Sequence, residues 1–173
     1  MEQIILENKK AISWVKVGQF GVFLTLLIVL PFLRNQLVTG SLVNALFFIS
    51  ASLLGFESAF LLCFVPSLVS IYAGLLPMAL APMIPFIIMG NCLLVFVFLK
   101  LSAKNFWVRA ILAAIIKFAF IWAAGMVLAN YVLHGIAKNV IQMVGWPQLA
   151  TAIAGAAIAF LLLKIIKKYG TRN

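Results

Sequence analysis

The chain is built from long apolar runs that are separated by short polar breaks. Hydrophobic residues make up 66% of its 173 residues, which is more apolar surface than the core of a soluble domain of this size can bury. A lipid bilayer accommodates such runs, because roughly 20 consecutive apolar residues cross its hydrocarbon core as a helix. Helices are expected rather than strands, since the runs do not alternate and a lipid-exposed backbone must satisfy its own hydrogen bonds. The sequence therefore predicts an all-α, polytopic membrane protein.

Six spans are predicted, and together they form one integral membrane domain over residues 1–173. The predicted spans cover residues 17–33, 37–54, 58–73, 83–99, 106–131 and 147–166. The segment from Gly74 to Pro85 contains Pro77, Pro82 and Pro85, so it cannot be a continuous helix. Because this segment is nevertheless apolar, we expect it to pack inside the protein or to line a cavity. The expected fold is a six-helix transmembrane bundle.

The positions of the basic residues predict how the bundle is oriented. With six spans both termini lie on one side, and that side holds most of the 13 Lys and Arg residues. The basic residues on this side are Lys9, Lys10, Lys16, Lys100, Lys104, Arg109, Lys164, Lys167, Lys168 and Arg172. The opposite side holds only Arg34 and Lys138. By the positive-inside rule the N- and C-termini are cytoplasmic, and a bacterial plasma membrane is the expected location.

Several classes of function are disfavoured by what the chain lacks. The formal charge of +10 lies beside membrane segments, whereas nucleic-acid proteins gather basic residues on a solvated face. No P-loop, HExxH motif or intramembrane carboxylate pair is present, so we expect no enzyme, no cofactor and no catalytic residues. Cys63 and Cys92 lie inside apolar runs, and a single histidine does not make a metal site, so no metal is expected.

Lys117 is the most informative single residue, because it lies well inside the fifth predicted span. It is some 15 Å from the cytoplasmic end of that span, at roughly 1.5 Å per residue. A charge at that depth costs about 3 kcal/mol on insertion scales, so a reason for it is expected. Lys117 either lines a polar pocket and contacts an anionic group of a ligand, or it snorkels or ties two helices together. Its depth does not decide between these two roles.

Four further polar residues are candidates for a ligand site near the outer side. Asn91 lies in the fourth span, where an amide needs partners and can serve either a ligand or another helix. Asn130 ends the fifth span, Gln148 begins the sixth, and Arg34 follows the first. We expect these side chains to converge with Lys117 on an outward-facing pocket, capped by the proline-rich loop from residue 74 to residue 82. Each one alone also fits an ordinary interfacial residue.

Small residues mark two candidate contact faces. The sixth span contains small residues four apart, among them Ala152 and Ala156, which permit a close approach of two helices. This face fits either packing within the bundle or docking of a partner subunit. In the first span the small residues are Gly18 and Gly21, and they form the second candidate face for docking of a partner.

These features together resemble one family of membrane proteins. The six short predicted helices, the cytoplasmic termini and the irregular apolar third outer loop resemble the substrate-binding S component of energy-coupling factor (ECF) transporters. The stretch APMIPFIIMGN, residues 81–91, looks like the region of such proteins that leads from this loop into the fourth helix. The stretch PQLATAIAG, residues 147–155, looks like the start of their last helix.

The resemblance implies a function as well as a fold. It implies a binding protein for a vitamin or a related micronutrient, which associates with a transmembrane coupling subunit and two separate ATPases. It assigns substrate binding to Asn91, Lys117, Asn130 and Gln148, and Lys117 then favours a substrate with a carboxylate or a phosphate. The alternative is a structural protein of a cell-shape or envelope complex, similar to the MreD family, in which the embedded polar residues serve helix contacts only.

Overall fold

The structure is a computed structural model that describes residues 2–76, 78–131 and 145–170. These residues form helices and no strands. Five helices are long and apolar enough to cross a membrane within the described part of the chain. They span Trp14–Leu33, Gln36–Leu54, Leu80–Lys100, Phe106–Ala129 and Trp146–Lys168. The predictions of an all-α fold and of a multi-pass membrane protein are therefore confirmed at this level, since several helices are suited to a bilayer.

The helices occupy nearly the predicted positions. Their bounds are α1 Glu2–Val29, α2 Gln36–Leu54, α3 Phe56–Leu62, α4 Val65–Tyr72, α5 Ile84–Lys100, α6 Phe106–Tyr131 and α8 Trp146–Gly170, with the 3-10 helices η1 Leu30–Leu33 and η2 Met78–Met83. The first helix begins at Glu2, well before the predicted start at Val17. The proline-rich segment forms η2 rather than a continuous helix, as its prolines require.

The third predicted span differs most from the structure, because it is broken into α3 and α4. Together they cover Phe56–Tyr72, which is shorter than the five long helices. Pro66 stands in the first turn of α4, where its missing N–H is tolerated but a continuous helix through Cys63 is not. The backbone N–H groups of Cys63 and Phe64 instead bond to the carbonyls of Phe60 and Leu61, three residues back.

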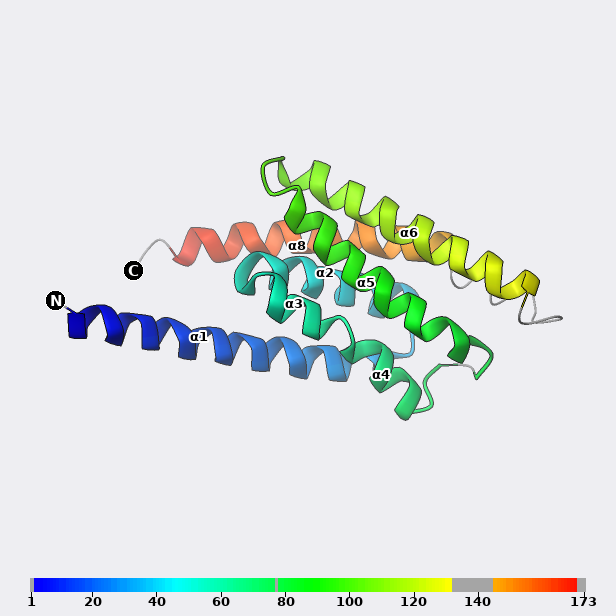
Figure 1. Ribbon diagram of the computed structural model, residues 1–173, viewed down its shortest axis with the longest axis horizontal. Coiled ribbons are helices and arrows are strands. Elements are labelled where there is room, and N and C mark those ends of the chain that lie inside the picture. Colours follow the sequence, from blue (N-terminus) through cyan, green and yellow to red (C-terminus); the bar gives the residue numbers. More distant parts are fainter. Residues whose placement is uncertain (1, 77, 132–144, 171–173) are drawn as a thin grey trace.

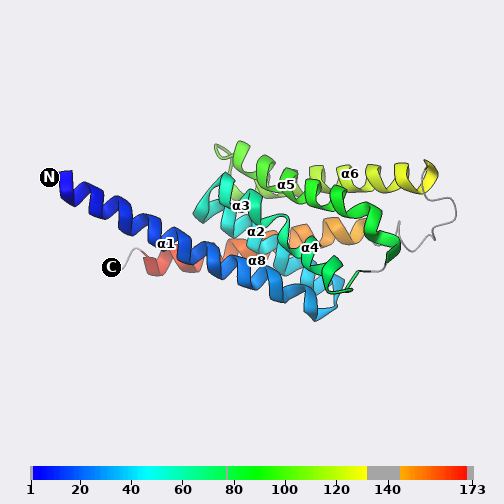
Figure 2. The ribbon, with the colours of Figure 1, turned by 60° about the horizontal axis from the view of Figure 1, so that its bottom comes forward.

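Successive elements run back and forth between the two ends of the molecule (Figure 1). Helix α1 begins and α8 ends at the same end, which we call the basic end; the α5–α6 connection with Lys100 and Lys104 lies there too. At the opposite end α1 leads into α2 and α4 leads towards α5. Figure 2 shows that α1 lies at the edge of the group, with its first turns extending beyond the other helices.

The tightest helix packing joins α2 to α8. Gly155 of α8 lies so close to α2 that an added Cβ would come within 2.7 Å of the Ser41 carbonyl oxygen and 2.8 Å of the Ala45 nitrogen. Only a residue without a side chain allows two backbones to approach in this way. Ala152, at 0% exposure, belongs to the same buried core. Asn44 of α2 lies at the same contact, since its Cβ would also be 2.7 Å from a Cβ added at Gly155.

An aromatic cluster fills the half of the molecule nearer the basic end. The ring of Phe98 in α5 lies edge-on to Phe48, with centroids 4.9 Å apart, and to Phe106, with centroids 5.5 Å apart. Arg109 of α6 places its guanidinium carbon 4.0 Å from the Phe98 ring centroid. Stacked and edge-on rings of this kind contribute about 0.5–1.5 kcal/mol each beyond the burial of their area. This half is therefore apolar and filled with side chains.

Candidate functional site

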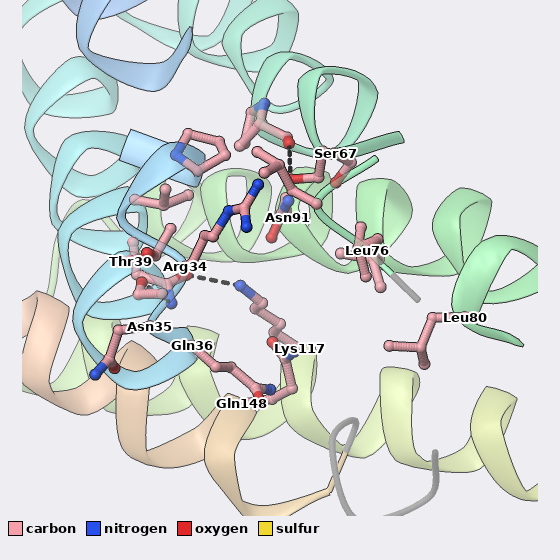
Figure 3. Close-up of a pocket in the computed structure, with 18 of the residues that line it drawn as sticks. Arg34, Asn35, Gln36, Thr39, Ser67, Leu76, Leu80, Asn91, Lys117 and Gln148 are labelled. Carbon is pink, nitrogen blue, oxygen red and sulfur yellow. Dashed lines mark hydrogen bonds between the residues drawn. The ribbon is translucent and has the colours of Figure 1, made fainter. Parts of the chain in front are cut away.

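A cavity of about 350 Å³ lies in the half of the molecule away from the basic end. Helices α2, α4, α5, α6 and α8 and the turn after η1 all contribute to it (Figure 3). Its lining residues are Pro31, Arg34, Asn35, Gln36, Thr39, Gly40, Val43, Asn44, Pro66, Ser67, Ser70, Gly74, Leu75, Leu76, Leu80, Ile87, Asn91, Lys117 and Gln148. Its volume lies within the range of small-molecule sites, which is roughly 300–1,000 Å³.

Lys117 reaches the cavity from the middle of α6. Its side chain is only 2% exposed, and its Nζ donates a hydrogen bond of 2.6 Å to Asn44 Oδ1 (Figure 3). A buried ammonium group is costly unless it is paired or solvated. Here its partner is a neutral amide, which accepts the hydrogen bond but does not neutralise the charge.

Asn44 is held in one orientation by α2 and α8. Its Nδ2 donates to the Gly40 carbonyl at 2.8 Å and to Thr151 Oγ1 at 3.3 Å. Thr151 in turn donates its hydroxyl hydrogen to the Gln148 carbonyl at 3.1 Å. Because both donors of the amide are used on that side, its oxygen must face Lys117. A chain of hydrogen bonds therefore runs from the ammonium group to the first turn of α8.

Arg34 stands at the cavity in an unusual backbone conformation. It has φ 53° and ψ 18°, which is left-handed, and its N–H donates to the Pro31 carbonyl at 3.2 Å. The next residue, Asn35, caps α2 by accepting a hydrogen bond from the Val38 N–H at 3.1 Å. The turn between η1 and α2 is thus closed on both sides of Arg34. Its side chain is exposed and points into the cavity in Figure 3.

Asn91 joins the cavity to the break between α3 and α4. Its side chain is 4% exposed, and its Nδ2 donates to the Cys63 carbonyl at 3.5 Å. This carbonyl lies at the interruption of the helix that precedes Pro66. The amide thereby serves a backbone group that the broken helix leaves exposed to the interior.

One side of the cavity is apolar and is formed where α4 ends. Gly74 adopts φ 62°, a conformation that favours glycine, and ends α4 in a tight turn with its N–H on the Ile71 carbonyl. Leu75 and Leu76 follow, and both of their N–H groups bond to the Ser70 carbonyl, at 2.9 and 3.2 Å. Leu76 and Leu80 of η2 lie across the cavity from Lys117 and Arg34 in Figure 3, and Leu75 also lines the cavity.

Four of the five predicted ligand-site residues line this one cavity: Arg34, Asn91, Lys117 and Gln148. The fifth, Asn130, lies in the last turn of α6, and its side chain falls outside the described part of the structure. Sequence reasoning missed Asn44, which is 2% exposed and holds Lys117. An amide inside an apolar span was the available signal for Asn44, as it was for Asn91.

The predicted partner-docking residues fall into two groups. Ala152 and Ala156 are 0% and 1% exposed and belong to the core, so their side chains pack inside the bundle. Packing within the bundle explains them, because they lie on the helix that approaches α2. Gly18 and Gly21 lie on an exposed face of α1, where an added Cβ would meet nothing within 4 Å.

The charges around the cavity are all of one sign. Arg34 and Lys117 line it, and no acidic side chain does so among the described residues. Glu57, the acidic residue in the first turn of α3, is exposed and does not line the cavity. His134 and Lys138 lie outside the described residues. No cluster of three or more His, Cys, Asp or Glu side chains that could hold a metal occurs in the described part of the chain.

No protein-family model, curated protein or solved structure matches this chain.

Proposed function

We propose that this chain is the substrate-binding membrane subunit of an ECF-type importer, which captures a vitamin or related micronutrient at the outer face of the membrane. The observation that carries this proposal is the cavity of about 350 Å³, into which Arg34, Asn91, Lys117 and Gln148 converge from four different segments. Polar side chains inside a membrane are expensive and mark functional sites by default. A cavity that gathers them together from distant parts of the chain is best explained by a ligand.

We propose six membrane crossings, with both termini in the cytoplasm of a bacterium. The sixth crossing is the pair α3–α4, whose broken shape still extends from the basic end towards the opposite end (Figure 1). Lys16, Lys100, Lys104, Lys164, Lys167 and Lys168 support this orientation, because they belong to the segments at the basic end. In this orientation the cavity opens to the outside, where a nutrient arrives.

We expect the chain to act with a coupling subunit and two ATPases rather than alone. It carries no nucleotide-binding motif, so the energy for import has to be supplied by other chains. The exposed face of α1 around Gly18 and Gly21 is the contact that we propose for the coupling subunit, since small residues let a second helix approach closely. The proposal requires no cofactor and assigns no catalytic step to this chain.

A structural role in an envelope complex is the second candidate, and one observation favours it. Lys117 is bonded to Asn44, and Asn44 to Thr151, so the same polar groups join α6, α2 and α8. A scaffold needs such ties but no open cavity beside them. The cavity is therefore the feature that separates the two functions.

Two measurements test the proposal. The full chain is purified in detergent and denatured, and the small molecules that it releases are identified by mass spectrometry. In parallel, a tagged chain is isolated from its native membranes, and the proteins bound to it are identified. A small molecule at near-stoichiometric amounts, together with ATPases and a coupling subunit, is expected. An empty protein that isolates with cell-wall or division proteins would favour the structural role.

A further inference from the structure

We infer that the substrate is a small organic acid, whose carboxylate or phosphate binds between Lys117 and Arg34 while its apolar body packs on Leu75, Leu76 and Leu80. This inference rests on the proposed function, since it names the substrate class of the same cavity. It concerns a free, water-soluble acid and not the headgroup of a phospholipid.

The charges that line the cavity are not balanced within the described residues. Arg34 and Lys117 line one cavity, and among the described lining residues no carboxylate accompanies them. The Lys117 ammonium is buried, so water does not compensate its charge, and the exposed guanidinium of Arg34 adds a second positive charge to the same cavity. Elsewhere in such proteins, buried cations are paired with acids or with backbone carbonyls. The missing counter-charge is what an anionic ligand would supply.

Lys117 has hydrogen-bonding capacity that the described residues do not use. An ammonium group has three N–H donors. One of them donates to Asn44 Oδ1 at 2.6 Å, and Nζ makes no other hydrogen bond to the described residues. The Lys117 side chain is only 2% exposed, and the open space beside it is the cavity. The two remaining donors are therefore available to an oxyanion in the cavity.

Arg34 reaches the same cavity from a turn with an uncommon backbone conformation. Its left-handed backbone is uncommon for a residue with a side chain, and such strain persists where the surrounding structure or function requires it. The strained turn directs the guanidinium into the cavity from the side of η1, while Lys117 enters from α6 (Figure 3). A guanidinium matches the geometry of a carboxylate or a phosphate through paired N–H donors.

The remaining walls define the rest of the molecule. Leu75, Leu76, Leu80 and Ile87 are apolar, whereas Ser67, Ser70 and Thr39 offer hydroxyl groups. A ligand with an acidic group at one end and an apolar body at the other matches this division. The volume of about 350 Å³ suits a vitamin-sized acid but not the two acyl chains of a phospholipid.

The experiment identifies and quantifies what the full-length protein retains. Wild type, Lys117→Met, Arg34→Gln and Lys100→Met are purified in parallel, and released molecules are measured by untargeted liquid chromatography and mass spectrometry. Lys100→Met is the matched control, because it removes an exposed charge outside the cavity. Lys117→Arg keeps the positive charge at the same position, so a comparison with Lys117→Met separates the effect of the charge from an effect on folding. Binding is then measured by thermal shift with acid and amide pairs, namely nicotinate and nicotinamide, biotin and biotinamide, and lipoate and lipoamide.

A retained organic acid is the expected result. We expect Lys117→Met to weaken its binding at least about 100-fold and Arg34→Gln about tenfold, since the first charge is buried and the second is at the rim. Lys117→Arg is expected to retain more of the acid than Lys117→Met, and Lys100→Met as much as wild type.

Other results would overturn the inference in distinguishable ways. A retained neutral or cationic molecule, or equal binding of acid and amide, would refute the inference that the substrate is an anion but would leave the proposed function intact. A retained phospholipid alone would refute the water-soluble substrate. A protein that retains nothing and responds to no member of the panel would refute both the substrate class and the proposed function.

Discussion

Two basic side chains on the same helix show how differently one bundle treats embedded charge. Arg109 and Lys117 lie eight residues apart on α6, or about 12 Å along its axis. Arg109 places its guanidinium carbon 4.0 Å from the ring centroid of Phe98 and 5.6 Å from that of Phe106. Among the described residues, Lys117 makes no cation–π contact of this kind. Its Nζ donates a hydrogen bond to the Asn44 amide oxygen, and its side chain lines the cavity.

The surroundings of each charge, and not its depth alone, indicate its role. The rings around Arg109 attract its charge, and Arg109 does not line the cavity. Its Nε is buried without a hydrogen-bond partner among the described residues. Lys117 instead retains two donors and an adjacent open volume. We therefore propose a structural role for Arg109 and a ligand-binding role for Lys117, and the following predictions test this division.

The largest effect is expected from Lys117→Met. Loss of the buried charge should weaken ligand binding at least about 100-fold, or about 2.7 kcal/mol, because the uncharged methionine side chain cannot neutralise an anion. The melting temperature should not fall, since methionine fills similar space and removes a costly buried charge. Isothermal titration with the retained ligand and thermal unfolding in detergent measure the two quantities.

A variant with lower stability and unchanged affinity would reverse this assignment. Lys117 would then be a helix tie, as the structural candidate function requires. Lys100→Met, an exposed residue away from the cavity, should leave both quantities unchanged and serves as the reference.

The next effect is expected where α2 and α8 support the cavity. In Gly155→Ala the new Cβ would come within 2.7 Å of Asn44 Cβ and of the Ser41 carbonyl oxygen, so the two helices must separate. Overpacking of this kind costs about 1–3 kcal/mol, and we expect a fall in stability of about 2 kcal/mol. Ligand affinity should fall as well, because Asn44 moves away from Thr151 and Lys117.

Gly21→Ala is the matched control, since an added Cβ meets nothing within 4 Å there. Alanine is the better helix former by about 1 kcal/mol, so this variant should be as stable as the wild type or more stable. Equal losses in both variants, read from thermal unfolding, would contradict the close contact between α2 and α8.

A third prediction adds the counter-charge that the cavity lacks. Asn44→Asp would place a carboxylate beside the Lys117 ammonium, which now meets the Asn44 oxygen at 2.6 Å. An internal ion pair competes with an anionic ligand, so we expect affinity to fall about tenfold, or about 1.4 kcal/mol. Affinity is measured by titration, and Asn105→Asp at the start of α6 provides the same change outside the cavity. A rise in affinity for the ligand in Asn44→Asp would instead indicate a cationic substrate.

The sequence predicted the helices better than their contacts, for a physical reason. Runs of apolar residues and the positions of prolines are local, so five long helices and the interruption before Pro85 were predictable. The break between α3 and α4 was missed, although Pro66 was visible, because an apolar run of this length reads as one span. Whether a proline bends a helix or interrupts it depends on the partners of the freed backbone groups.

The candidate site was predictable only in part, for the same reason. Lys117 and Asn91 are conspicuous because each is a strongly polar residue inside an apolar run. Asn44 also lies in an apolar span, but Thr39, Ser41 and Ser50 make that helix more polar, so its amide is less conspicuous. Its role follows from the face of α2 that meets α6 and α8, which is a tertiary property. Ala152 and Ala156 show the same limit, since small residues mark a close contact without naming the partner.

The smallest effect is expected from Arg109→Met, which completes the comparison on α6. The cation–π contact with Phe98 should contribute about 0.5–1 kcal/mol at this half-buried site, and a thioether beside aromatic rings recovers part of it. Stability should therefore change by less than about 1 kcal/mol. Ligand affinity should stay within about twofold of the wild type, since Arg109 does not line the cavity. If titration showed Arg109→Met to be as damaging to binding as Lys117→Met, the effect would follow from the total charge of the helix, and the division between a structural and a ligand-binding cation would fail.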